Sequence, residues 1–141
     1  LDLLRGAGIK HAKILVVAVN DVAQSLAIID LAREQNSRIK IIARAVDRFH
    51  AYQLYKRKVD SVVRETFASS LEAATETLEQ LGYTEGQALE VAKRFRLHDE
   101  ELLERSAQHL EDIEELRNIA QSGRRELELL FEEDTRKHVA D

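Results

Sequence analysis

Three groups of polar residues follow three short apolar segments in the first half of the chain. Asn20 and Asp21 come after the first segment, Arg44 and Asp47 lie at the end of the second, and residues 64–66 (Arg-Glu-Thr) close the third. In an open parallel sheet, ligands bind at the edge where the strands have their carboxyl ends. If the apolar segments are strands, these polar side chains gather at one such edge. The sequence therefore predicts a ligand site there.

Arg64 is the most informative of these residues. A guanidinium at a strand end, beside the amino end of the next helix, is well placed to hold a carboxylate or a phosphate. The hydroxyl of Thr66 is expected to cap that helix. An ion pair of Arg64 with Glu65, with Asp60 or with an acid on the last helix is an equally weighted alternative. Residue types alone do not separate the two hypotheses.

The remaining reactive residue types do not form a motif for catalysis. Five histidines are scattered, none at metal-ligand spacing from another, namely His11, His50, His98, His109 and His138. The chain has no cysteine, no nucleophile elbow, no Walker loop and no glycine-rich dinucleotide fingerprint. We therefore expect no catalytic residue, no metal site and no enzymatic turnover from this chain.

The elements that position the polar groups are predicted from periodicity. Strands are expected at residues 13–19, 39–45 and 60–65, the first of them buried on both faces because its apolar run is nearly continuous. Asp21 and Asp47 are expected to cap the helices that follow the first two strands. A third helix is expected at residues 66–81, ended by Gly82. This alternation indicates an α/β fold, the C-terminal half of a Rossmann-like doubly wound parallel sheet.

A helical extension is predicted after the sheet. From Thr84 onward the sequence indicates almost unbroken helix with two apolar stripes, one formed by Leu103, Ala107 and Leu110 and the other by Ala120, Gly123, Leu127 and Leu130. Such a stripe either docks on its own domain or binds a partner chain, and docking is the favoured alternative. We divide the chain into a Rossmann-like part, residues 1–82, and a helical extension, residues 83–141.

Charge and composition narrow the class of protein. The formal net charge is −5, with no basic stripe along a helix, which argues against binding to nucleic acid. The longest apolar run, residues 14–19, is far shorter than the ~20 residues of a membrane span. The chain starts at Leu1, contains no methionine and enters the predicted sheet from a helix at residues 1–8. We expect missing upstream sequence. We also expect the outer strand of the sheet, whose backbone groups are unpaired on one side, to favour a dimer.

Five short sequence segments, taken in chain order, resemble the cytosolic domain of Kef-type glutathione-regulated potassium efflux systems, called the KTN or RCK domain. The resemblance extends from Leu1 to about Arg105, with a weaker echo at residues 124–128. It is carried by Leu1-Asp2-Leu3-Leu4-Arg5-x-Ala7-Gly8, by residues 14–19, by Ile41-Ile42-Ala43-Arg44-Ala45 with Asp47 and His50, by Arg64-Glu65-Thr66-Phe67, and by Phe95-Arg96-x-His98-Asp99.

The resemblance implies a ligand-sensing domain that gates a potassium/proton antiporter in response to glutathione and its conjugates. Arg64 and Asp99 map onto the family's glutathione site, although some members carry asparagine in place of Asp99. Asn20 and Asp21 map onto its nucleotide pocket, which implies NAD(H) or AMP as a ligand. The family's phosphate-binding glycine loop does not occur in this chain.

The family's partners follow from the same resemblance. They are a second copy of the domain in a homodimer, an upstream membrane antiporter domain and a flavodoxin-like oxidoreductase as ancillary subunit. The implied location is the cytoplasmic face of a bacterial inner membrane, with this fragment itself soluble. The alternatives are the C-terminal half of an NAD-dependent dehydrogenase and a helical protein-interaction module.

Overall fold

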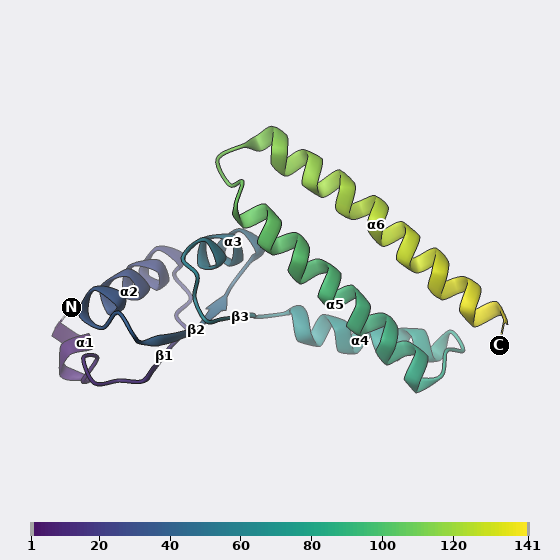
Figure 1. Ribbon diagram of the computed structural model, residues 1–141. Coiled ribbons are helices and arrows are strands. Elements are labelled where there is room, and N and C mark those ends of the chain that lie inside the picture. The colour runs from purple at the N-terminus through teal and green to yellow at the C-terminus, as the bar shows by residue number, and fades with distance from the viewer. Residues whose placement is uncertain (1, 141) are drawn as a thin grey trace. The chain divides into compact units, whose positions relative to one another are not determined.

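The chain consists of two compact units with opposite charge. The computed structural model describes the backbone of residues 2–140 and the side chains of 3–112 and 114–136. The units are Leu1–Glu65 and Thr66–Asp141 (Figure 1), and each is described by itself. The first carries 12 Lys and Arg against 7 Asp and Glu, and the second 9 against 19, so the charge boundary coincides with the boundary between the units. The division of domains after residue 82 stays a prediction.

The first unit is a parallel α/β sheet. Its elements in chain order are α1 (Asp2–Gly6), β1 (Ile14–Val17), α2 (Val22–Gln35), β2 (Lys40–Ala45), α3 (Arg48–Lys56) and β3 (Ser61–Arg64). The strands pair in the order β1-β2-β3, all parallel, with Val17 beside Ala43 and Ala45 beside Arg64. The predicted parallel sheet is therefore confirmed, with β2 as its central strand.

One face of the sheet carries the core of this unit. Consecutive right-handed crossovers between neighbouring strands place their helices on the same face, and in Figure 1 α2 and α3 lie on the same side of the strands. The side chains of Ile41, Ala43 and Ala45 are buried on that face. On the opposite face of β1, Ile14 is 55% and Val16 is 65% exposed. The prediction that the first strand is buried on both faces is therefore wrong for this structure.

Two of the three predicted helix caps form. The Oδ1 atoms of Asp21 and Asp47 accept from the backbone N–H of Gln24 at 2.6 Å and of His50 at 2.7 Å. Thr66 has helical dihedral angles (φ −109°, ψ −3°) and its side chain makes no capping hydrogen bond. A capping residue normally has extended dihedral angles, which aim its hydroxyl at the first free amides. The predicted cap at Thr66 is therefore wrong.

Arginine side chains tie α2 to the end of α3. Arg57 is paired with Asp30 at 3.0 Å between Nε and Oδ1. Arg33 donates to the carbonyl oxygen of Arg57 and, at 2.6 Å, to that of Lys58. Lys58 adopts the left-handed region (φ 51°). Arg33 therefore stabilises carbonyl groups that the end of a helix leaves without intrahelical partners.

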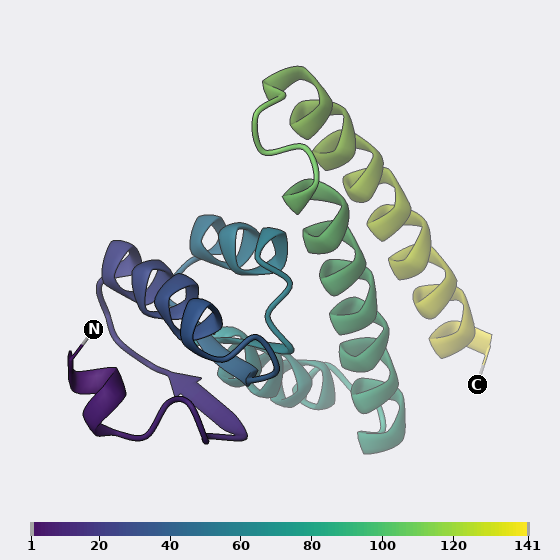
Figure 2. The ribbon, with the colours of Figure 1, turned by 60° about the vertical axis from the view of Figure 1, so that its left-hand side comes forward.

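The second unit is built from three helices, α4 (Phe67–Gln80), α5 (Glu85–Ala107) and α6 (Ile113–Ala140). Gly82, with φ 100°, ends α4 as predicted, and Thr84 with Gln87 forms a capping box at the start of α5. The expected almost unbroken helix is interrupted at residues 108–112, where turns let the chain reverse, and α5 and α6 run antiparallel (Figures 1 and 2).

Close packing of α5 and α6 selects which apolar residues are buried. Leu103 and Ala107 are buried as the first stripe predicts. On α6, Ile119 is buried and Ala120 is exposed, so the predicted second stripe is wrong by one residue at that position. A Cβ atom on Gly123 would lie 2.6 Å from Cδ1 of Leu102, which shows how closely the two helices approach. No helix in the described part of the chain combines the length and hydropathy that crossing a membrane requires.

His50, in the first turn of α3, is fully buried. Its Nδ1 accepts from the backbone N–H of Val46 at 3.3 Å, and its backbone N–H is held by Asp47. Burial lowers the pKa of His50 below its ordinary value of 6.5, opposed by the charge of Asp47 and assisted by that of Arg57. The folded protein therefore favours the neutral imidazole.

We predict that the free energy of unfolding decreases as the pH falls below about 6.5. There the unfolded chain gains a proton at His50 that the folded chain resists, so acid favours unfolding. His50→Asn keeps an acceptor near the position of Nδ1 but does not titrate, and it should flatten this pH dependence. Thermal melts from pH 7.5 to 5.5 test the effect, with the exposed His11→Asn as matched control. Equal pH slopes in wild type and His50→Asn would contradict it.

Candidate functional site

The carboxyl ends of the three strands are joined by one arginine. Arg44 comes from the central strand β2, and its Nη2 donates to the carbonyl oxygen of Ala18 at 2.9 Å and to Oδ1 of Asn20. Its Nη1 lies 3.7 Å from Oε1 of Glu65, the residue after β3. The topological rule selected Asn20, Arg44 and Glu65 as residues of one sheet edge, and the structure brings them together. The sequence did not predict that Arg44 links the other two.

The two predicted nucleotide-binding residues have different local roles. Asp21 is committed to capping α2, because its Oδ1 holds the N–H of Gln24. The Oδ1 of Asn20 accepts from Arg44, so the amide nitrogen of Asn20 is the donor that it can offer to a ligand. Both residues are exposed. This loop therefore presents a hydrogen-bond donor and the amino end of α2 at the sheet edge.

Arg64 is the last residue of β3 and is half-buried. It pairs in register with Ala45, which places its side chain on the face where α2 and α3 pack. The position at a strand end agrees with the topological prediction for Arg64.

Asp99, the second predicted glutathione residue, lies on α5 and is buried. Arg64 belongs to the first compact unit and Asp99 to the second, so each is described within its own unit. Two aromatic residues near Arg64 and Asp99 in the sequence are in contact inside the second unit. The ring centroids of Phe67 and Phe95 are 6.3 Å apart. Arg96 lies over the Phe67 ring at 5.6 Å.

Ion pairs link α5 to α6 along their length. Glu126 of α6 contacts His98 at 3.1 Å and Arg105 at 3.0 Å, both through Oε2. Arg94 pairs with Asp134 and, at 3.3 Å, with Glu133. The hydrogen bond from Arg105 lowers the pKa of Glu126, desolvation opposes it, and His98 adds a smaller lowering effect. These pairs were not predicted, because they join residues 21 to 40 positions apart.

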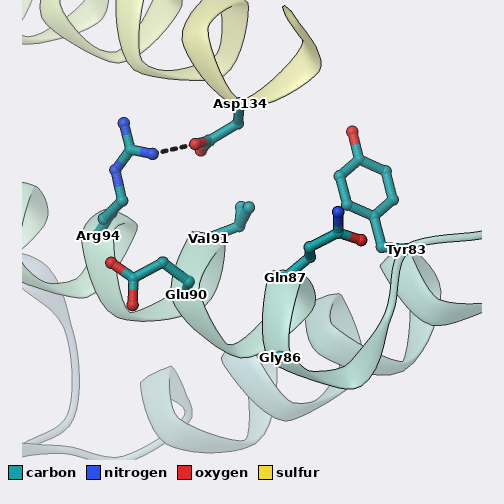
Figure 3. Close-up of a pocket in the computed structure, with 7 residues that line it drawn as sticks. All are labelled: Tyr83, Gly86, Gln87, Glu90, Val91, Arg94 and Asp134. Atoms are coloured by element: carbon teal, nitrogen blue, oxygen red, sulfur yellow. Dashed lines mark hydrogen bonds and ion pairs between the residues drawn. The ribbon is translucent and has the colours of Figure 1, made fainter. Parts of the chain in front are cut away.

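A shallow pocket of about 240 Å³ lies where the start of α5 faces the end of α6 (Figure 3). It is lined by Tyr83, Gly86, Gln87, Glu90, Val91, Arg94 and Asp134. The ion pair of Arg94 and Asp134 spans the two helices at one side of this pocket. None of the predicted ligand residues lines it. The pocket therefore shares no residue with the candidate site at the strand ends.

The histidines lie in different surroundings. His11 is exposed, His50 is buried, His98 contacts Glu126, and His109 is half-buried in the turn after α5. The side chain of His138 lies outside the described residues. Within the described part of the chain, no three His, Asp or Glu side chains are grouped so that they could hold a metal ion.

Comparison with known proteins gives two family matches. A family model described as the potassium efflux system KefB C-terminal domain matches residues 69–141, and the TrkA-N domain matches residues 1–65. A glutathione-regulated potassium-efflux system protein from Haemophilus influenzae (strain ATCC 51907 / DSM 11121 / KW20 / Rd) is 37% identical over 109 residues, 77% of this chain. The chain spans only 18% of that protein's length.

A solved structure, the Shewanella denitrificans Kef CTD in AMP bound form, is similar to this chain with a TM-score of 0.72. The two are 39% identical, and the match covers 76% of this chain and 67% of the other. The predicted α/β class, with a Rossmann-like sheet followed by helices, agrees with this likeness.

We predict that Glu126→Gln loosens α6 from α5 at neutral pH. Because its pKa is lowered in the folded chain, the Glu126 carboxylate stabilises the fold above its ordinary pKa of 4.5, and this contribution is lost as the pH falls below that value. Amide hydrogen exchange in α6 should be about twofold to fivefold faster in the variant at pH 7, the range expected for surface ion pairs. Glu128→Gln, an exposed change on the same helix, is the control. Equal exchange in the two variants would count against the role of Glu126.

Proposed function

This chain belongs to the family of potassium efflux system KefB C-terminal domains, and on that premise we propose that it senses glutathione and a nucleotide for such a system. The observation that carries the proposal is the polar edge of the sheet, where Asn20, Arg44 and Glu65 meet beside Arg64. The relative in Haemophilus influenzae is named as glutathione-regulated.

The nucleotide part of the proposal places an adenine nucleotide at the loop of Asn20 and Asp21. Support comes from the position of this loop at the end of β1, before the amino end of α2, where ligands of open α/β sheets bind. The related Shewanella domain is described in an AMP bound form. AMP or NAD(H) is therefore the proposed nucleotide, and the amide nitrogen of Asn20 is its proposed donor.

The glutathione part assigns Arg64 as the anchor of a carboxylate. Glutathione carries two carboxylates and one amino group, and a planar guanidinium binds a carboxylate through two parallel hydrogen bonds. Asp99 has the opposite charge, so we propose it as a residue that binds the amino group of glutathione. Arg64 lies at a strand end and Asp99 is buried on α5, and both settings suit a group that is withdrawn from bulk water.

The partners of the proposed sensor follow from the family. The domain acts on an upstream membrane antiporter domain at the cytoplasmic face of a bacterial inner membrane. It pairs with a second copy of itself, and a flavodoxin-like oxidoreductase is the proposed ancillary subunit. In this arrangement the chain itself catalyses no reaction and gates a potassium/proton antiporter.

Titration of the chain with reduced glutathione tests the proposal. Arg64→Ala should lower the affinity for glutathione by about tenfold to a hundredfold, because a charge-assisted pair with a carboxylate contributes roughly 1.5–3 kcal/mol. Arg64→Lys should also weaken binding, because lysine keeps the charge but loses the two-pronged geometry. Calorimetry gives the affinities, and thermal melts of the same samples give the stability.

Arg38→Ala is the matched control for these variants, because Arg38 is an exposed arginine of the same unit that precedes β2 at the opposite edge of the sheet. It should leave glutathione affinity unchanged. Unchanged affinity together with lowered stability in Arg64→Ala would mean that Arg64 serves the fold through an ion pair. Absence of glutathione binding to the wild type would overturn the proposed sensing function.

We also predict a dimer or larger assembly in solution, because exposed apolar side chains on β1 and β3 favour association. Light scattering at micromolar concentration measures the mass. Particles of 16.1 kDa, the mass of a single chain, would contradict this prediction.

A further inference from the structure

Arg44 is placed to connect the two ligand positions. It projects from the central strand, so the residues that end both neighbouring strands are within its reach. Toward β1 it holds the carbonyl of Ala18 and the side chain of Asn20, which belong to the loop that leads into α2. Toward β3 it holds the carboxylate of Glu65. A single side chain therefore fixes the loops on both sides of its strand.

The guanidinium group makes this double contact possible. Its N–H groups diverge in a rigid plane, so Nη2 serves the first loop while Nη1 faces the second. The Arg44 side chain is 28% exposed and that of Glu65 is 45% exposed, so the pair is only partly screened by solvent. Lysine would bring the same charge as a single point, and it could not serve both loops in this geometry.

Glu65, the residue that Arg44 contacts at the end of β3, is next in sequence to Arg64, the proposed glutathione anchor. The backbone N–H of Glu65 donates to the carbonyl of Ala45 at 3.1 Å, and its side chain is paired with Arg44. Arg64 immediately precedes Glu65 and is itself in register with Ala45. The loop at Asn20 and the segment that carries Arg64 are therefore linked through Arg44 and Glu65.

We propose that Arg44 is a positioning residue that couples nucleotide binding at Asn20 to glutathione binding at Arg64. This inference rests on the proposed function and adds a regulatory link within it. A nucleotide that orders the loop at Asn20 also orders Arg44, and through Glu65 the segment of Arg64. Glutathione then binds to a segment that is already ordered, so the coupling is positive.

The coupling is measured as a ratio of two affinities. Reduced glutathione is titrated into the wild-type chain with and without saturating AMP, and the dissociation constant should be at least about fivefold lower with AMP. Linkage requires that glutathione tighten AMP by the same factor, which the reciprocal titration checks. A residue with a merely structural role would change the stability of the chain and leave this ratio as it is.

Arg44→Gln should reduce the ratio to about one, whatever the affinity of each ligand alone in the variant. Arg44→Lys should also reduce it, because lysine cannot make the two contacts together. Glu65→Gln removes the charge that pairs with Arg44 and leaves the contacts of Arg44 with the Asn20 loop. Because the Glu65 side chain is half-exposed, this variant should fold even if the Arg44 variants do not, and it tests the same link. Arg38→Gln, with the same charge change at the opposite edge of the sheet, should keep the wild-type ratio.

The outcomes separate this inference from the function on which it rests. Wild-type binding of both ligands with a ratio of one, or an unchanged ratio in folded Arg44→Gln and Glu65→Gln, would overturn the coupling and leave the sensing function standing. Failure of the wild type to bind glutathione or AMP would overturn the proposed function, and the coupling with it.

Discussion

The structure of the first unit depends on the parallel alignment of three adjacent strands. Because β1, β2 and β3 run in the same direction, their carboxyl ends and the following loops meet at one edge. The buried side chains of Ile41, Ala43 and Ala45 hold the central strand against α2 and α3. This packing leaves β2 with little freedom to move. The central strand therefore provides a fixed base from which one arginine can contact the loops that follow both neighbouring strands.

The second unit is held by a different balance of forces. Its net charge is strongly negative, and charges cover most of its helical surface. The apolar contact between α5 and α6 is narrow, with Gly123 against Leu102 and with Leu103 and Ala107 buried. Lys and Arg are fewer than Asp and Glu in this unit. Ion pairs such as that of Arg94 with Asp134 reduce the local repulsion between acidic side chains. The position of α6 along α5 is therefore set by charge pairing as well as by burial.

Local signals in the sequence predicted more of the fold than of the site. Asp21 and Asp47 cap helices as expected, and Gly82 ends α4, because each of these roles depends only on neighbouring residues. Thr66 failed as a cap because the chain enters α4 with helical dihedral angles. The single-residue error at Ala120 arose because the contact between two helices, and not the spacing within one, decides which side chains are buried.

The site itself was predictable as a set of positions but not as a network. Parallel topology placed Asn20, Arg44 and Arg64 at one edge before any contact was known. The bond from Arg44 to Asn20 and the pair of Glu126 with His98 depend on side-chain reach across separate elements. Periodicity and spacing carry no information about such distances.

The exposed face of β1 has a consequence for the behaviour of the chain during folding. Residues 14–19 combine β-branched side chains with the absence of charge, and β1 lies at one end of the strand order. Such a segment is a template for strand addition between chains before the fold is complete. Lys13 and Asp21 flank it with charges of opposite sign, in the manner of gatekeeper residues that oppose aggregation. The carboxylate that caps α2 is therefore also one of the two charges that flank this apolar segment.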